Sequence, residues 1–143
     1  MGLQMKQAQH RLSVQTDGPG LYEVTDEVAA WLSNQEVRTG LLTVFVRHTS
    51  ASLVIQENAD PDVQTDLHSF FERLVVEDPR LYRHSNEGPD DMPAHVKSAL
   101  TQTQLSIPVQ DRRMVLGTWQ GIFAFEHKRA PSMRELVLHI LGE

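Results

Sequence analysis

Short segments in which apolar and polar residues alternate run along most of the chain and predict a β-rich fold. Residues 10–16 place Leu12 and Val14 on one face, and the turn-forming residues DGPG follow directly. Residues 40–58 are apolar on both faces and rich in β-branched and aromatic residues, as is typical of one or two strands in a well-covered sheet. Three later segments complete a set of at least five predicted strands: residues 103–109, 114–127 and 135–141.

Three other segments follow the helical period. The first lies within residues 24–34, and the second begins after a predicted N-cap, Asp60, with Pro61 at the first helical position. The apolar residues of the second helix share one face: Val63, Leu67, Phe70 and Leu74. A short third helix is opened by Pro93. Because helices and strands do not alternate regularly, the predicted fold class is α+β, in a single domain spanning residues 1–143.

Residues 75–92 have no sustained period and predict a loop of about 17 residues. Loops of this length are uncommon in compact domains and are usually functional or disordered. The loop leads into the polar stretch HSNEGPDDMPAHVK at residues 84–97, which has a histidine near each end and three carboxylates between them. This stretch is therefore either a solvated loop, which its composition favours, or one wall of a site.

Composition and charge narrow the function classes. The chain has no cysteine, so a metal site would have to use histidine, aspartate or glutamate. With 13 Lys and Arg against 19 Asp and Glu, the net charge is −6 and no basic cluster is present, which argues against nucleic-acid binding. The longest apolar runs have strand length, and the N-terminus has no apolar signal region. We therefore expect a cytoplasmic protein without nucleic-acid or membrane partners.

Histidine is the commonest metal ligand and a natural acid or base near neutral pH. His48 ends a predicted strand, points to the same face as the apolar residues before it if the alternation continues, and is followed by Thr49 and Ser50. The end of a strand is a usual place for a site. The alternative is a strand-end histidine that is hydrogen-bonded to the backbone.

Three more histidines stand beside acidic residues. His84 and His95 flank Glu87, Asp90 and Asp91, but their separation matches no zinc signature. The segment FEH ends another predicted strand with a histidine, which is either a ligand or an ordinary rim residue: His127. The other histidines are predicted to be structural or at the surface: His10, His68 and His139.

The segment GTWQGI at residues 117–122 has Gly117 and Gly121 on either side of Trp119 and Gln120. A glycine inside a strand marks a bulge or a close approach of the backbone. The Walker spacing is missing, so the segment is not a phosphate loop, and Trp119 is predicted to be a core or interface residue. Neither GxSxG nor HExxH occurs, which removes the best evidence for common hydrolases and zinc proteases.

Six stretches, in order and spacing, together resemble the YjbQ family, also called UPF0047, from about residue 16 onward: HTSASL, NADPDV, HSNEGPDDMPAHVKSAL, SIPV, GTWQGIFAFEH and LGE. The resemblance implies a compact α+β fold with a sandwich-like, mostly antiparallel sheet, a homotrimer, and a pocket of histidines and acids that often holds a metal ion such as zinc. The departures are few. Family members commonly have Gly-Arg at Arg112-Arg113, arginine at Lys128, and a glycine-containing turn in place of APSM near residue 131.

The resemblance also implies the residues of the site. The expected metal ligands are His48, His95 and His127, with His84 as an alternative; three neutral imidazoles would leave an open coordination position. The residues expected to orient ligands, take part in catalysis or bind magnesium carried by a pyrophosphate are Glu57, Asn58, Ser50, Glu87, Asp90 and Asp91. The residues expected to bind substrate are Thr49, Gly117, Trp119, Gln120, Gly121 and the cations Arg47, Arg83, Lys97, Arg113 and Lys128.

Members of that family are labelled secondary thiamine-phosphate synthases. The resemblance therefore implies a metal-assisted transferase that joins a hydroxymethylpyrimidine pyrophosphate to a thiazole phosphate and releases pyrophosphate. Dedicated synthases are (β/α)8 barrels of about 250 residues, so the label would mean similar chemistry on an unrelated scaffold. One alternative is another small phosphorylated or anionic metabolite, with synthase activity incidental. The other is a trimeric metal- or ligand-binding protein that is not an enzyme.

Overall fold

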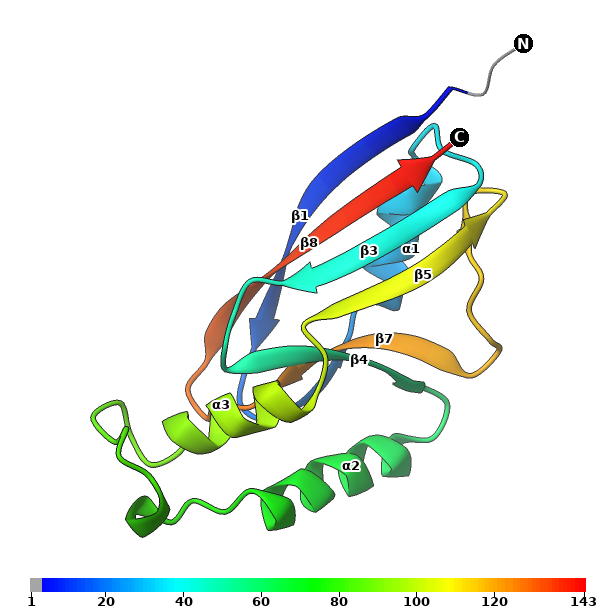
Figure 1. The fold of residues 1–143 in the computed structure, drawn as a ribbon. Helices are drawn as coiled ribbons and strands as arrows, with labels where there is room; N and C mark the ends of the chain where they lie inside the picture. Colours follow the sequence, from blue (N-terminus) through cyan, green and yellow to red (C-terminus); the bar gives the residue numbers. More distant parts are fainter. Residues whose placement is uncertain (1–3) are drawn as a thin grey trace.

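Two antiparallel sheets form the framework of the molecule (Figure 1), and the computed structural model describes residues 4–143. The larger sheet has five strands in the order β1 (Lys6–Thr16), β8 (Ser132–Gly142), β3 (Gly40–Val46), β5 (Gln104–Gln110) and β6 (Arg113–Met114). The smaller sheet has the order β2 (Gly20–Glu23), β7 (Gln120–Glu126) and β4 (Ala51–Glu57). Every pairing within both sheets is antiparallel.

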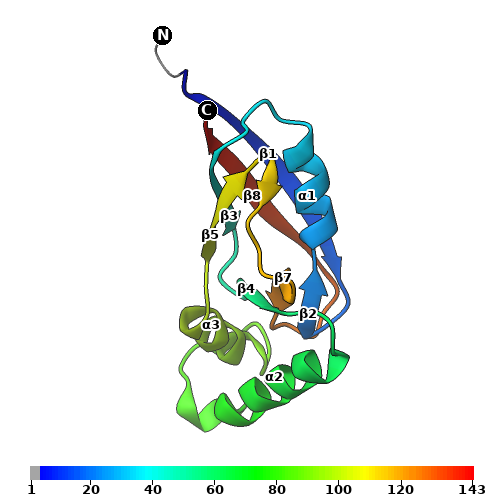
Figure 2. The ribbon, with the colours of Figure 1, turned by 90° about the vertical axis from the view of Figure 1, so that its right-hand side faces the viewer.

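Three α-helices accompany the sheets: α1 (Thr25–Ser33), α2 (Pro61–Leu74) and α3 (Asp91–Leu100), with a short 3-10 turn at Pro79–Leu81. In Figure 2, α1 and the small sheet lie on the same side of the large sheet, while α2 and α3 lie together at one end of the molecule. The chain is thus a single compact α+β domain, and the predicted fold class is confirmed. None of the helices within residues 4–143 has the length and hydropathy to cross a membrane.

The core lies between the large sheet and the layer formed by α1 and the small sheet. The inward residues of the large sheet alternate along β3, β5 and β8, as the sequence pattern predicts. They are Leu42, Val44, Val46, Leu105, Ile107, Val109, Leu136, Leu138 and Ile140. Val28, Leu32, Leu53 and Ile122 cover them from the other layer. Each fully buried aliphatic side chain contributes about 1.5–3 kcal/mol to folding, so this face fixes the register of the strands.

The second helix departs from its prediction. Its N-cap is as expected, because the Asp60 carboxylate accepts the Asp62 N–H at 2.9 Å. The predicted apolar face is only partly covered, however: Val63 and Leu67 are half-buried, but Phe70 is 49% exposed and Leu74 is 55% exposed. The packed face continues from Val63 and Leu67 to Phe71, whose ring meets the β7 residue Phe125 edge-on with the centroids 5.4 Å apart. Periodicity identified the helix but only part of the face that the rest of the chain covers.

The hairpin between β5 and β6 has side chains where glycine is favoured. Gln110 pairs with Arg113, and the two residues between them have positive φ angles, 51° at Asp111 and 65° at Arg112. A two-residue hairpin with both angles positive is a type I′ turn, which favours glycine at its second position.

Replacing Arg112 by glycine should therefore stabilise the protein by about 1 kcal/mol, because a side chain in the left-handed region is strained by an amount of that order. The Arg112 N–H would keep its hydrogen bond to the Arg38 carbonyl at 3.0 Å. Urea unfolding of Arg112→Gly measures the change, and Arg113→Gly, in the adjoining strand residue, is the matched control that should lose stability. A less stable Arg112→Gly protein would contradict the strain argument.

Candidate metal centre

Two histidines and an aspartate meet at the start of α3. His84 lies in the long loop, Asp91 is the first residue of the helix, and His95 follows one turn later on the same helical face. One ligand atom from each side chain lies within 4.8 Å of the other two. Over residues 4–143, this is the one group of three or more such side chains that comes this close. The polar stretch is therefore wrapped around a specific cluster and is not simply a solvated loop.

The hydrogen bonds of His95 decide which of its nitrogens carries a proton. Its Nδ1 lies 2.8 Å from the carbonyl oxygen of Thr49, which can only accept, so Nδ1 carries the hydrogen. In a neutral ring, Nε2 then has a lone pair, and it lies 3.2 Å from Asp91 Oδ2, which is also an acceptor. The same oxygen lies 2.6 Å from His84 Nε2, which can donate to it. The contact between His95 and Asp91 thus requires either a second ring proton or a cation between the two acceptors.

A lysine meets the other oxygen of the aspartate. Lys128 Nζ donates to Asp91 Oδ1 at 2.7 Å and lies 3.7 Å from Asp90. This hydrogen bond lowers the pKa of the buried Asp91 carboxyl to about 2, although burial works against the charge. Burial would lower the pKa of Lys128, but its bond to Asp91 and the charge of Asp90 raise it. Asp90 is itself oriented by the Arg129 N–H at 2.9 Å. Asp91 and Lys128 are therefore both charged at neutral pH.

The donor set fits a divalent transition metal such as zinc. Two imidazoles and one carboxylate are ligands that zinc prefers, and they leave at least one coordination position open. Ligands around one zinc ion lie about 3.3 Å apart when each is bound at about 2.0 Å. The His95–Asp91 separation is close to that value, whereas His84 is nearer to Asp91 and would have to move outward. The His84 side chain is 46% exposed and has room to do so.

Beneath this group, a buried ion pair joins β7 to β8. Arg134 contacts both oxygens of the fully enclosed Glu126 carboxylate, at 2.7 Å through Nε and 2.5 Å through Nη2. Burial would raise the pKa of Glu126, but hydrogen bonds from Arg134 and Thr16 lower it. Arg134 also donates to the backbone and hydroxyl oxygens of Ser50. The pair therefore fixes the HTS segment against the end of β7.

His48 lies beside this ion pair but is bonded to the backbone of β8, and it is not part of the histidine group. Its Nε2 accepts the Glu135 N–H at 2.9 Å, so the proton of the neutral ring is on Nδ1, which lies 3.4 Å from Arg134. Burial and the charge of Arg134 both lower the pKa of His48. Neither ring nitrogen offers a lone pair to a metal in this arrangement. Of the two interpretations of His48 from sequence, the histidine bonded to backbone describes its geometry.

His127 is buried and ends a chain of hydroxyl groups. Its Nε2 lies 2.9 Å from Ser52 Oγ, which lies 2.6 Å from Thr101 Oγ1, which in turn lies 2.9 Å from the Lys97 carbonyl. The Lys97 carbonyl can only accept, so Thr101 donates to it. All three bonds then form only if Ser52 donates to Thr101 and His127 donates to Ser52. His127 therefore carries its proton on Nε2 and has its lone pair on Nδ1. His127 is not a member of the group of His84, Asp91 and His95.

Burial lowers the pKa of His127 to about 3. An unfolded histidine titrates near 6.5, so below that pH the unfolded chain binds a proton that the folded chain does not. The stability from this group is complete above pH 6.5 and is lost as the pH falls toward 3. The expected loss between pH 7 and 5 is about 2 kcal/mol.

Replacement of His127 by glutamine, whose amide can still donate to Ser52, should remove that part of the pH dependence. The measurement is urea unfolding with a chelator present at pH 5, 7 and 8, with pH 8 as the baseline at which the ring is neutral in both states. An identical pH dependence in the original protein and in His127→Gln would show that the buried ring is not the cause.

The other residues that the resemblance assigns to the site, in and beside the GTWQGI and NADPDV segments, lie at the end of the small sheet that is far from Glu126 and His127. In the β4–β7 pair, Ala51 faces Glu126 and Glu57 faces Gln120. Six residues of strand separate these two ends, or roughly 20 Å. The distant residues are Glu57, Asn58, Gly117, Trp119, Gln120 and Gly121. Within one chain they form a second polar region and do not reach the histidines.

This second region has a well-defined local structure. Asn58 Nδ2 donates to Glu23 Oε2 at 2.9 Å, and a side chain at Gly121 would meet that oxygen at 2.7 Å, so Gly121 allows the close approach expected of a strand glycine. The Gly117 N–H donates to the Gln120 side chain at 2.8 Å. Trp119 is 61% exposed and is not part of the core of the single chain. These contacts order the loops around an exposed indole.

Of the five cations expected to bind phosphate, one lies at the histidine group, and it is Lys128. Lys97 is buried, and its ammonium lies 2.6 Å from a glutamate of α2, so it is already paired. Arg47 forms an ion pair with Glu135 at 2.7 Å. The other two are exposed: Arg83 lies in the long loop directly before His84, and Arg113 lies in β6. Glu87 is also exposed, in the loop that carries His84.

Sequence reasoning missed Arg134, the residue that organises the floor of the site. A signal was present, because the alternation of β8 places Arg134 on the same face as Leu136, Leu138 and Ile140. A charged residue at an inward position is almost never buried without a partner. The pattern alone could therefore have predicted a buried ion pair, but not that Glu126 is its partner.

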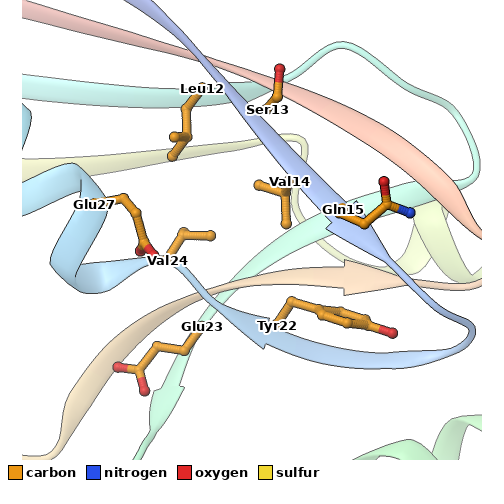
Figure 3. Close-up of a pocket in the computed structure, with 8 residues that line it drawn as sticks. All are labelled: Leu12, Ser13, Val14, Gln15, Tyr22, Glu23, Val24 and Glu27. Atoms are coloured by element: carbon orange, nitrogen blue, oxygen red, sulfur yellow. The ribbon is translucent and has the colours of Figure 1, made fainter.

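The cavity in Figure 3 is not a convincing alternative site. It has a volume of ≈ 290 Å³ and lies between β1 and the segment that joins β2 to α1. Leu12 and Val14 form its apolar wall, and it is also lined by Glu23 and Glu27 but by no lysine, arginine or histidine. Two carboxylates without a cation would repel a phosphorylated or anionic ligand.

Comparisons with known proteins agree along most of the chain. The model of the family described as UPF0047 protein YjbQ-like matches residues 10–143. A UPF0047 protein of Synechocystis sp. is 55% identical over 138 residues, covering 96% of this chain and 94% of the relative. The UPF0047 protein YjbQ of Escherichia coli O157:H7 is 40% identical over 136 residues, covering 94% and 98%. These alignments include both polar ends of the small sheet.

Solved structures show the same architecture. A YbjQ-like protein of Sulfolobus solfataricus superposes with a TM-score of 0.89 at 25% identity, over 98% of this chain and 100% of the other. A hypothetical protein of Aeropyrum pernix has a TM-score of 0.86 at 30% identity, over 95% and 99%. The arrangement of strands and helices is therefore shared over the full length of these structures.

Proposed function

The chain belongs to the UPF0047 YjbQ-like family, and on that premise we propose that it binds a divalent metal ion, zinc in the first instance, together with a small phosphorylated metabolite. The ligands would be His84, Asp91 and His95. One observation carries the proposal: the Nε2 lone pair of His95 faces an oxygen of the ionised Asp91, an arrangement that a cation between them would stabilise. This set replaces His48 and His127 of the ligands expected from sequence.

The residues around the metal have separate tasks. Thr49 fixes the tautomer of His95 through its carbonyl, so that Nε2 stays available. Lys128 has three N–H donors, and among residues 4–143 its one hydrogen bond to a side chain is to Asp91 at 2.7 Å, so a donor is left for a phosphate oxygen. When bound, the metal would supply a positive charge that polarises a phosphoryl oxygen. The site thus offers two positive centres to an anionic ligand in a chain with an overall negative charge.

The reaction we propose for this site is the transfer implied by the family label. The bond between the methylene carbon of a hydroxymethylpyrimidine and its pyrophosphate breaks, and pyrophosphate leaves with the electron pair. The ring nitrogen of a thiazole phosphate then forms the new carbon–nitrogen bond. Lys128 would hold the departing pyrophosphate.

We also propose that the protein is a homotrimer. The resemblance implies this state, and the exposed Trp119 at the second polar region is the kind of residue that subunit contacts cover. Light scattering after size exclusion should give three times the 16.2 kDa mass of the chain. A monomeric mass would contradict the proposal.

Untagged protein purified without chelators should contain about one zinc per chain. When it is mixed with the two thiamine precursors, it should catalyse their joining, which is measured by the release of pyrophosphate.

Replacement of Lys128 by methionine should lower kcat/KM by about 100-fold or more while zinc content is kept, because removing one charged group from a transition state costs about that much. The matched control is Lys6→Met, at a half-exposed lysine of β1, which should stay within twofold. Turnover that persists in Lys128→Met or in metal-free protein would refute the proposed chemistry.

A further inference from the structure

A cavity of ≈ 230 Å³ adjoins the metal centre and shares His84 with it. Its lining residues come from the long loop and from the start of α3; Figure 1 shows these two segments following one another at one end of the molecule. Tyr82 and Pro79 line it from the loop, and Met92 and Pro93 line it from the first turn of α3. Met92 directly follows Asp91, so the cavity and the proposed metal ligands are built on the same few residues.

The lining of this cavity differs from that of the metal centre. No lysine, arginine, aspartate or glutamate lines it, and His84 is its one titratable side chain apart from the tyrosine. Proline rings, a tyrosine ring and a methionine thioether present apolar surfaces to flat ring systems. A cavity of about 150 Å³ can hold benzene. The volume here therefore suits one six-membered ring with small substituents.

We propose that this cavity binds the ring of the ligand whose phosphate contacts the metal and Lys128. The substrate class is then a phosphate ester that carries one six-membered aromatic or heteroaromatic ring, with the ring against His84 and Met92. This inference rests on the proposed function, because it places the phosphate at His84, Asp91 and His95. It adds a separate site for the rest of the molecule and assigns Met92 as the residue that determines ring size.

The test compares methyl phosphate with benzyl phosphate by calorimetry on zinc-loaded, full-length protein. Benzyl phosphate should bind at least about tenfold more tightly, as burial of a ring of this size would produce. Met92→Trp fills the cavity and should reduce this advantage to less than about threefold, while the Kd of methyl phosphate stays within about twofold. Met133→Trp, at a methionine 58% exposed on β8, is the matched control and should keep the full preference.

Ser85→Trp provides a second way to fill the cavity from an exposed loop position, in case Met92→Trp fails to fold. Equal affinity for the two phosphates in the unmodified protein, or a preference kept in the filled variants that fold, would overturn the ring site alone. Methyl phosphate binding that is absent, or that does not depend on zinc, would overturn the proposed function and this inference with it.

Discussion

Replacement of Arg134 by methionine should lower the free energy of unfolding by about 4 kcal/mol, which makes it the most destabilising single change expected in this protein. The reason is the position of Glu126, whose side chain is completely enclosed and whose two oxygens both contact the guanidinium. Without Arg134, a buried carboxylate would lose its counter-charge. Hydrogen bonds from Thr16 and from the backbone of His127 and Lys128 would remain but could not replace it.

Urea unfolding at pH 7 measures this change, and two further variants identify its cause. In the double variant Glu126→Gln/Arg134→Met neither member of the pair carries a charge, so most of the lost stability should return. Arg47→Met removes an exposed ion pair with Glu135 and should cost less than about 1 kcal/mol. If Arg134→Met and Arg47→Met cost the same, the buried pair is not the strong structural element that its geometry indicates.

Replacement of Asp91 by asparagine should lower zinc affinity by about 1,000-fold or more. Asparagine keeps the shape of the side chain but removes the charge that the two histidines share, and loss of a direct ligand exceeds the 10–100-fold effect of outer partners. A competition titration against a chromogenic chelator measures the Kd. Glu87→Gln, in the same loop, is the matched control and should change the Kd by no more than about threefold.

The same titration separates this site from the ligand set expected from sequence. If His48 and His127 hold the metal, His48→Ala and His127→Ala should lose zinc while Asp91→Asn retains it. The geometry predicts the reverse order, because His48 accepts a backbone N–H and His127 donates to Ser52. Tight, stoichiometric zinc in Asp91→Asn would therefore remove the proposed centre.

The pattern of apolar residues predicted most of the strands and helices, because strand alternation and helical spacing reflect which residues face the core. It did not predict which residues come together at the site. With the helix expected to open at Pro93, Asp91 belonged to the loop, and its relation to His95 was hidden. The helix begins at Asp91, so the two residues lie four apart on one helical face. The helix thus begins two residues before the predicted start, and this difference places the carboxylate of Asp91 beside the histidines.

Other parts of the site depend on contacts between distant segments. The pairing of Glu126 with Arg134, the backbone bond to His48 and the hydroxyl chain at His127 follow from how β7, β8 and the HTS segment come together. The 20 Å separation of the two polar regions follows from the β4–β7 register, roughly as strand rise predicts. Local patterns along the chain do not contain such information, which explains why the motif residues looked like one site.

The ladder between β1 and β8 has a consequence for how the chain reaches this state. It pairs Thr16 with Ser132 and continues to Lys6 and Gly142, so it joins segments more than a hundred residues apart. Loop closure over such a distance is entropically costly and makes folding slow, on the scale of milliseconds to seconds. During synthesis β1 must wait for β8 with an unpaired edge, the condition in which strands associate with other chains. Newly made molecules should therefore be most prone to aggregation before residues 132–142 emerge.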